Sequence, residues 1–181
     1  MHDIGSPLTG GLALEACNMT LELVTRNPTG FHDITGAAQT FVETSGVQAG
    51  ILVAQSLHTT AGLLLNEDET GLKVDFANIA DRLIPKDGNY THDDFDVRCE
   101  NLCPEDYEAP NGHSHLQQAM FGSPSMMLII ADRALVLGRW QRLFLLEFDR
   151  PRKRFVRFLA LGSEAAGVQE SPAADTAALY R

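Results

Sequence analysis

Several short segments of the chain carry the period-two pattern of β-strands. In residues 18–25, apolar side chains occupy every second position, which is typical of a strand with one buried face. Residues 51–57 are almost continuously apolar, and their short length favours a buried strand over a helix. A further apolar run follows at residues 61–65. The first third of the chain therefore predicts three strands.

Four more strands are predicted late in the chain, at residues 126–130, 134–137, 142–148 and 154–161. Asp132-Arg133 lies between the first two and suits a hairpin turn. This run of short strands separated by turn residues favours antiparallel pairing.

Helical spacing of apolar residues is found in two segments. One begins near Asp33-Ile34-Thr35 and ends at Gly46, and the other covers residues 75–84 and stops at Pro85. Residues 116–121 predict a third, shorter helix that Gly122 closes. Between them, residues 92–112 are acidic and without a regular period, which predicts a long loop of the kind that often carries function.

These elements predict one domain with an α+β fold, in which a largely antiparallel sheet or sandwich is covered on one side by two or more helices. We expect a loose N-terminal extension at residues 1–16, the folded domain at residues 17–162, and a mobile tail at residues 163–181. A length of 181 residues and 44% apolar residues are sufficient for a real hydrophobic core.

A formal net charge of −10 limits the classes of partner. So acidic a surface is repelled by nucleic-acid phosphates and by anionic lipid, so neither is an expected partner. The N-terminus lacks the basic residues of a signal peptide, and the apolar runs are too short to span a bilayer. These observations predict a cytoplasmic protein, whose anionic ligands would need a local patch of positive charge.

Histidines supply the main candidate chemistry. His58 follows a strand, His92 precedes the acidic loop, and His113 and His115 form a His-x-His pair just before a predicted helix. Neutral imidazoles bind metal ions, and two rings so close in sequence can reach one ion if the backbone is extended. The alternative is a network of structural histidines. His2 and His32 are assigned to structural or surface roles.

Carboxylates and cysteines add weaker signals. Glu147 ends an apolar strand, and a buried carboxylate needs a partner, for which Arg152 is close in sequence. A surface ion pair is the alternative. Cys99-x-x-x-Cys103 lies between two histidines and suits either a zinc site or two unrelated thiols. Three cysteines in all do not indicate a disulfide framework.

Taken in order, these segments resemble the YjbQ family, also called secondary thiamine-phosphate synthases. The resemblance rests on His58-Thr59-Thr60-Ala61, Asn66-Glu67, Asp75, Tyr90-x-His92, Asn111-Gly112-His113-Ser114-His115-Leu116, Gly122-Ser123, Leu137-Gly138-x-Trp140-Gln141 and Glu147-Phe148-Asp149-x-Pro151-Arg152. It covers about residues 18–162. The family usually has Gly where this chain has Arg150, which would strain the turn if a positive φ is required there.

The resemblance implies an α+β homotrimer whose histidine-lined pocket holds a divalent metal ion. It implies a weak thiamine-phosphate synthase activity, which joins a pyrimidine pyrophosphate to a thiazole phosphate and releases pyrophosphate. In this hypothesis His58, His113 and His115 hold the metal ion. The catalytic residues are Glu67, His92, Glu147 and Arg152. The substrate is contacted by Thr59, Thr60, Asn66, Asn111, Ser123 and Gln141. The alternative is a non-catalytic protein that binds a metal ion or a small phosphorylated metabolite in the same pocket.

Overall fold

The computed structural model describes residues 14–26, 30–102 and 109–164. Most of the predicted N-terminal extension, residues 27–29, Cys103 and nearly all of the predicted C-terminal tail lie outside the described residues. The first strand begins at Glu15, so the folded domain starts two residues before the predicted boundary.

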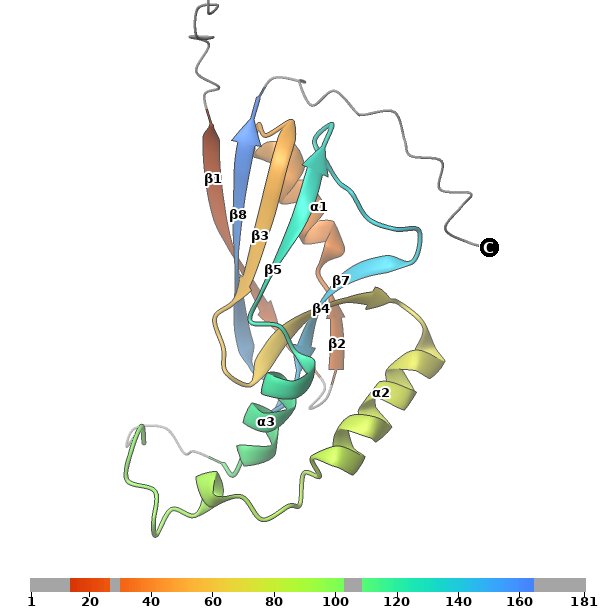
Figure 1. Ribbon diagram of the computed structural model, residues 1–181. Helices are drawn as coiled ribbons and strands as arrows, with labels where there is room; N and C mark the ends of the chain where they lie inside the picture. The colour runs from red at the N-terminus through yellow and green to blue at the C-terminus, as the bar shows by residue number, and fades with distance from the viewer. Residues whose placement is uncertain (1–13, 27–29, 103–108, 165–181) are drawn as a thin grey trace, which may run out of the picture.

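Two antiparallel sheets form the body of the molecule (Figure 1). The larger sheet has the strand order β1-β8-β3-β5-β6, with bounds Glu15–Val24, Lys153–Ser163, Ala49–Ser56, Ser125–Ala131 and Ala134–Leu135. The smaller sheet has the order β2-β7-β4, with bounds Gly30–Asp33, Gln141–Glu147 and Ala61–Glu67. The predicted strands are confirmed, but β2 was missed, and the late strands are shared between the two sheets.

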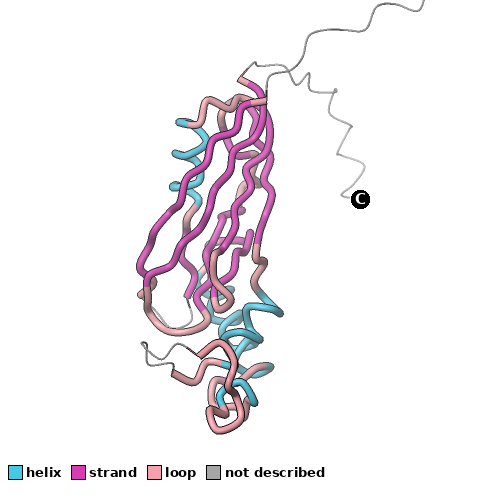
Figure 2. The backbone as a smooth tube through the Cα atoms, turned by 90° about the vertical axis from the view of Figure 1, so that its left-hand side faces the viewer, coloured by secondary structure: helices cyan, strands magenta, loops and turns pink. Residues whose placement is uncertain are grey.

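The helices are α1 (Thr35–Thr44), α2 (Thr70–Leu83) and α3 (Gly112–Phe121), with a short 3-10 turn η1 at Thr91–Asp93. The predicted α+β class is confirmed. The helices do not share one side: α1 packs on the larger sheet, whereas α2 and α3 lie with the loop between them at one end of the strands (Figures 1 and 2). Within the described residues, no helix combines the length and apolarity needed to cross a membrane.

Strand β7 connects two hydrophobic cores. Its residues Leu143 and Leu145 pack with α1 and the inner face of the larger sheet. The alternate residues Phe144 and Leu146 face the other way and pack, with Phe148, against aromatic side chains of β2, α2 and α3. Because side chains alternate along a strand, β7 contributes buried residues to a core on each face of the smaller sheet.

Two helices begin earlier than predicted because side chains outside the apolar pattern cap them. Glu69 accepts hydrogen bonds from the backbone N–H groups of Gly71 and Leu72, so α2 begins at Thr70. The carboxylate of Asp93 accepts from the N–H groups of Asn111 (2.8 Å) and Gly112 (2.9 Å) at the start of α3. Such contacts satisfy the N–H groups that a helix N-terminus leaves unpaired.

Two turns discussed from the sequence can be compared with the structure, the hairpin at Asp132-Arg133 and the turn that contains Arg150. Asp132 and Arg133 have φ values of 52° and 61°, as a two-residue hairpin between β5 and β6 requires. Arg150 is not among the described non-glycine residues with positive φ, which are Asn101, Asp132 and Arg133. The arginine at position 150 therefore brings no backbone strain to its turn.

The end of α3 is held by a close backbone contact. A Cβ atom added to Gly62 of β4 would lie 2.7 Å from the Cα atom of Gly122, the residue that follows α3. Only glycine at these two positions lets the strand and the helix end approach so closely.

A buried ion pair joins the two sheets. Glu147 of β7 is fully buried, and Arg154 of β8 is 2% exposed. The Arg154 guanidinium donates from Nε to Glu147 Oε2 at 2.7 Å and from Nη2 to Glu147 Oε1. The same carboxylate accepts from the hydroxyl of Thr25 (2.9 Å) and the backbone N–H of Asp149 (3.0 Å), and Arg154 also donates to Thr60 (2.9 Å). Both charges are thus fully compensated inside the protein.

We expect Arg154→Met to lower the free energy of unfolding by about 3–5 kcal/mol, because it leaves the Glu147 carboxylate buried without its counter-charge. The double variant Glu147→Leu/Arg154→Met should recover most of that loss. Lys153→Met is the matched control, since Lys153 pairs with Glu22 on the surface, where such pairs contribute about 0–1 kcal/mol. Urea unfolding at one protein concentration measures the free energy of unfolding of all three variants. Equal losses of stability in Arg154→Met and Lys153→Met would contradict the stabilising role of the buried ion pair.

Candidate functional site

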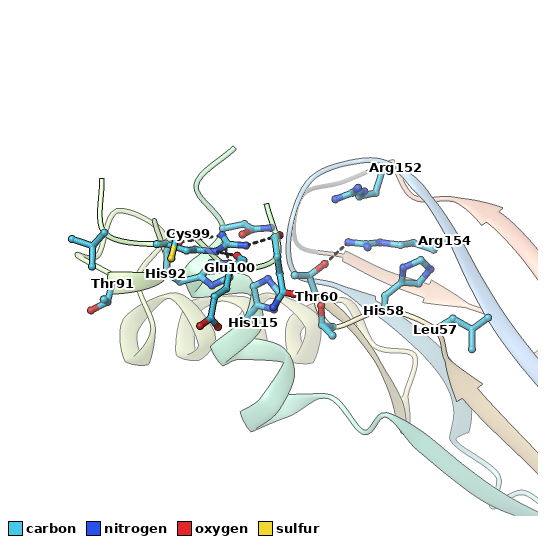
Figure 3. Close-up of a pocket in the computed structure, with 15 residues that line it drawn as sticks. Leu57, His58, Thr60, Thr91, His92, Cys99, Glu100, His115, Arg152 and Arg154 are labelled. Carbon is cyan, nitrogen blue, oxygen red and sulfur yellow. Dashed lines mark hydrogen bonds between the residues drawn. The ribbon is translucent and has the colours of Figure 1, made fainter. Parts of the chain in front are cut away.

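A cavity of about 860 Å³ lies at the end of the strands, between the β3–β4 turn and the start of β8 on one side and the segment from η1 to α3 on the other (Figure 3). Its basic lining residues are His58, His92, His115, Arg98, Arg152 and Arg154. Its polar and acidic lining residues are Thr59, Thr60, Thr91, Glu100, Asn101 and Asn111. The remaining lining residues are Leu57, Val97 and Cys99.

Guanidinium groups are concentrated in this cavity, in contrast to the chain as a whole. Arg98, Arg152 and Arg154 line it together with one carboxylate, that of Glu100, whereas the chain carries a formal net charge of −10. The charge of Arg154 is compensated by Glu147. Arg152 is 43% exposed and donates from Nη1 to Asp149 at 3.1 Å, which uses one edge of its fork. Arg152 and Arg154 therefore line the cavity as members of ion pairs whose carboxylates are not part of its lining.

His58 is held in one tautomer. Its Nε2 accepts a hydrogen bond from the backbone N–H of Phe155 at 2.8 Å, and its ring stacks on the Phe155 ring with an interplanar angle of 21°. Because a backbone amide can only donate, the proton of the neutral imidazole is on Nδ1. Burial, followed by the positive charge of Arg154, lowers the pKa of His58 from its ordinary value of 6.5.

His92 and His115 lie side by side at the opposite wall. Their ring centroids are 4.5 Å apart. Nη1 of Arg98 lies 3.1 Å from Nε2 of His92 and also donates to the His92 carbonyl. A guanidinium has no acceptor, so Nε2 of His92 is the accepting nitrogen in this pair.

His113 does not share the cavity with His58 and His115, which corrects the prediction that these three histidines point into one pocket. The His-x-His pair lies inside α3, which starts at Gly112 and not at Leu116 as predicted. Residues two apart on an α-helix differ by about 200° around the axis, so their side chains point to opposite sides. His115 lines the basic cavity, and His113 lines a second cavity.

The trio His58, His113 and His115 therefore does not fit a metal ion. His113 is on the wrong side of α3, and Nε2 of His58 already accepts a backbone hydrogen bond. Across the described residues, no three His, Cys, Asp or Glu side chains group in a way that suits a metal ion. The divalent ion stays a prediction, as does a zinc site at Cys99, whose partner Cys103 is outside the described residues.

Glu147 has a different role from the one predicted. It was expected to pair with Arg152 and to reach the pocket rim, but its partner is Arg154 and its side chain has no exposed surface. It acts on the cavity through Arg154, which forms part of the wall.

Four other predicted site residues lie away from the cavity: Asn66, Glu67, Gln141 and Ser123. Asn66 and Glu67 are at the far end of β4, and Gln141 is opposite Glu67 in the ladder with β7. A strand of this length places Glu67 roughly 20 Å from Thr60. Ser123 pairs with Leu63 in an isolated bridge. Of the predicted substrate-binding residues, Thr59, Thr60 and Asn111 do line the cavity.

Two arginines of the site were missed. Arg98 lies in residues 92–112, which have no regular period, so no sequence pattern predicted its position in the fold. Arg154 was within reach of the sequence, because Arg154, Val156, Phe158 and Ala160 alternate on the buried face of β8. An arginine in such a series must have a buried partner.

The family is decided by the match of a family model, described as UPF0047 protein YjbQ-like, to residues 19–163. The chain belongs to the YjbQ-like family. A UPF0047 protein of Methanothermobacter thermautotrophicus is 30% identical over 84% of this chain and 96% of its own length. A UPF0047 protein of Archaeoglobus fulgidus is 33% identical over 79% of this chain and its whole length.

Solved structures of YjbQ-like proteins have the same fold. One from Sulfolobus solfataricus, titled a protein of unknown function, superposes with a TM-score of 0.70 at 26% identity, covering 83% of this chain and all of that one. One from Clostridium acetobutylicum superposes with a TM-score of 0.66 at 32% identity, covering 79% and 98%. YjbQ-like membership thus rests on sequence and fold together.

Stability should fall as the solution is acidified below pH 6.5. The pKa of His58 is lowered in the folded protein, so the unfolded chain takes up the proton first, and protonation favours unfolding as the pH drops from 6.5 through the folded-state pKa. His32 and His113, whose pKa values burial also lowers, act in the same direction. The loss of unfolding free energy on acidification should be smaller in His58→Gln than in the unmodified protein, because glutamine takes up no proton in this range.

Histidine side-chain NMR measures this directly. The His58 resonances should titrate with a midpoint below 6.5 and show the neutral form protonated at Nδ1. A proton on Nε2 would refute the assigned hydrogen bond, and a midpoint above 6.5 would contradict the lowering of the His58 pKa by burial.

Proposed function

We propose that the basic cavity binds a small phosphorylated metabolite. The observation that carries the proposal is the pair of hydrogen-bond donors that line one cavity in an otherwise acidic chain, the Arg152 fork and Nδ1–H of His58. Guanidinium groups match the geometry of phosphate oxygens, and a cavity with donors already in place binds anions without first reorganising. Thr59, Thr60 and Thr91 add hydroxyl groups to the same wall.

The reaction we propose is thiamine-phosphate synthesis, in which a pyrimidine pyrophosphate is joined to a thiazole phosphate and pyrophosphate leaves. Negative charge builds up on the leaving diphosphate, so fixed cationic groups favour its departure. Arg152 and Nδ1–H of His58 are suited to receive that charge, and the paired rings of His92 and His115 are suited to move a proton. Asn111 contributes a buried Oδ1 without a partner in the described chain, an acceptor for an N–H or O–H of the substrate.

A binding protein without catalysis is the second candidate, and the same cavity supports it. The Arg152 fork and Nδ1–H of His58 suit the holding of an anion whether or not a reaction follows. In either case a divalent ion bound together with the phosphate groups is part of the proposal, because phosphates themselves commonly supply ligands to Mg²⁺. We propose a cytoplasmic setting, where phosphorylated metabolites and such ions are available.

We expect Arg152→Ala to weaken pyrophosphate binding at least about tenfold, because a charge-assisted bidentate contact is lost. Arg152→Lys should recover only part of it, since an ammonium has no fork. Arg139→Ala is the matched control: Arg139 stacks on Trp140, outside the cavity. Calorimetric titration with pyrophosphate, with and without Mg²⁺, measures each affinity.

Equal affinities in Arg152→Ala and Arg139→Ala would rule out the phosphate site. Formation of thiamine phosphate from its two precursors, compared with His115→Ala, then separates the two candidates. Turnover that depends on His115 supports the enzyme, and pyrophosphate binding without turnover supports the binding protein. Metal analysis of the protein as purified tests the divalent ion.

We propose further that the chain forms a homotrimer. The outer face of the larger sheet, opposite α1, supports self-association because it carries two apolar rows across three strands: Ile129, Ile51 and Leu161 in one, Met127, Val53 and Leu159 in the other. Met127 and Ile129 are 72% and 62% exposed. Contiguous apolar surface of this kind is typical of subunit contacts.

Light scattering should give about three times the chain mass of 19.8 kDa at micromolar concentration. Ile129→Lys should shift the protein toward the mass of a single chain, because it places a charge in the contact. Val74→Lys on α2, also at an exposed apolar position, should leave the mass unchanged. A single-chain mass for the unmodified protein would exclude the trimer.

A further inference from the structure

A second cavity, of about 260 Å³, lies between α2 and α3 and takes no part in the proposed function. Its polar lining consists of Asn78, Asp81, Lys86, His113, Gln117 and Asp149. It is on the opposite side of α3 from the basic cavity, since His113 and Gln117 are one turn apart on one face while Asn111 and His115 are one turn apart on the other. This volume is enough for a few water molecules or a small organic group.

Gln117 has an unused acceptor in this wall. The side chain is 4% exposed, and its Nε2 donates to the carbonyl of Ile84 at 2.9 Å. That bond fixes the orientation of the amide, and Oε1 is then buried with no hydrogen-bond partner in the described part of the chain. Buried carbonyl oxygens are normally paired, so Gln117 is suited to accept an N–H group from an occupant of the cavity.

His113 also presents an acceptor. The hydroxyl of Ser114 donates to the carbonyl of Phe148 at 2.8 Å, so its single proton is used there. The contact of 3.1 Å between Ser114 Oγ and His113 Nε2 is therefore donated by the imidazole. With the proton on Nε2, the neutral ring keeps a bare Nδ1. Burial and the charge of Lys86 lower the pKa of His113 and hold it in this neutral form.

The charges around the cavity favour a cationic occupant. Asp81 and Asp149 contribute two carboxylates, against the single ammonium of Lys86. Asp149 is buried, and only its Oδ2 receives the Arg152 side chain. The described residues hold no group of three metal-ligating side chains, so an organic donor suits these acceptors better than a bare metal ion.

We propose that the cavity between α2 and α3 is a binding site for a small organic cation with N–H donors, of the amidinium or guanidinium class. Its N–H groups pair with Gln117 Oε1, His113 Nδ1 and the carboxylates of Asp81 and Asp149. The site goes beyond the proposed function, because the two cavities are lined by different residues. The ion pair of Asp149 with Arg152 is a contact between their walls.

Methylguanidinium and tetramethylammonium are the two probes, since both carry one positive charge and only the first has N–H donors. In amide NMR titrations of the full chain, methylguanidinium should shift resonances in α2 and α3 around Asp81 and Gln117, with a Kd of about 1 mM or tighter. Tetramethylammonium should produce no saturable shift there. Equal shifts from both probes, or none from either, would overturn the proposal.

Variants test the assigned acceptors. Asp81→Asn keeps the oxygen that accepts from the Lys86 N–H but removes the charge, and it should weaken methylguanidinium binding about tenfold. Gln117→Met should also weaken methylguanidinium binding about tenfold. Gln118→Met, on another face of α3, should leave this binding unchanged. Gln117→Met also loses the hydrogen bond to the Ile84 carbonyl and could fail to fold for that reason. In that case the methylguanidinium affinity of Asp81→Asn alone tests the site. Pyrophosphate binding should be unchanged in Asp81→Asn, and unchanged methylguanidinium affinity in that variant would refute the site.

Discussion

The contact between Glu147 and Arg154 sets the geometry on which the rest of this structure depends. A carboxylate and a guanidinium taken out of water are tolerated only when every oxygen and N–H finds a partner. Here those partners come from both sheets and from the segments next to them: Thr25 after β1, Thr60 before β4, and Asp149 after β7. Satisfying one pair of charges therefore fixes the relative positions of several chain segments at the end where the basic cavity opens.

The arrangement also explains why one wall of the cavity is rigid. Thr60 and Arg154 belong to the wall and to the buried network at the same time. His58 is fixed through the backbone of Phe155, the residue after Arg154. The opposite wall is built from η1, residues 97–101 and the first turn of α3, where the Asp93 carboxylate joins η1 to the start of the helix. A ligand would thus meet one preorganised wall of strands and one wall of helix and loop.

The parts of this structure that sequence patterns could predict are those ruled by local periodicity. Alternation predicted β1, short apolar runs predicted β3 and β4, and a series of short strand-like segments predicted β5 to β8. Helical spacing predicted α1 and the body of α2. Helix starts set by distant or atypical caps were missed: Asp93 caps α3 from a separate segment, and Glu69 is not a preferred capping residue.

That single error at the start of α3 had the largest effect on the site. An extended His113-Ser114-His115 would have presented both imidazoles to one ligand, whereas the helix sends them to cavities of different polarity. Arg154 was predictable from its place among the inward residues of β8, but Arg98 was not, because its segment has no period. Which residues meet across the cavity depends on tertiary contacts that one sequence does not display.

Helix α3 is the partition between the two cavities, and it is fixed at both ends, by Asp93 at its start and by the contact of Gly122 with Gly62 at its end. Adding or removing one residue within it would turn the following side chains by about 100°. His115 and Gln117 would then leave their cavities together. In the evolution of this chain, changes of length should therefore be tolerated in the segment before Asn111 and excluded between Asn111 and Gly122, so that the spacing within α3 is inherited as one unit.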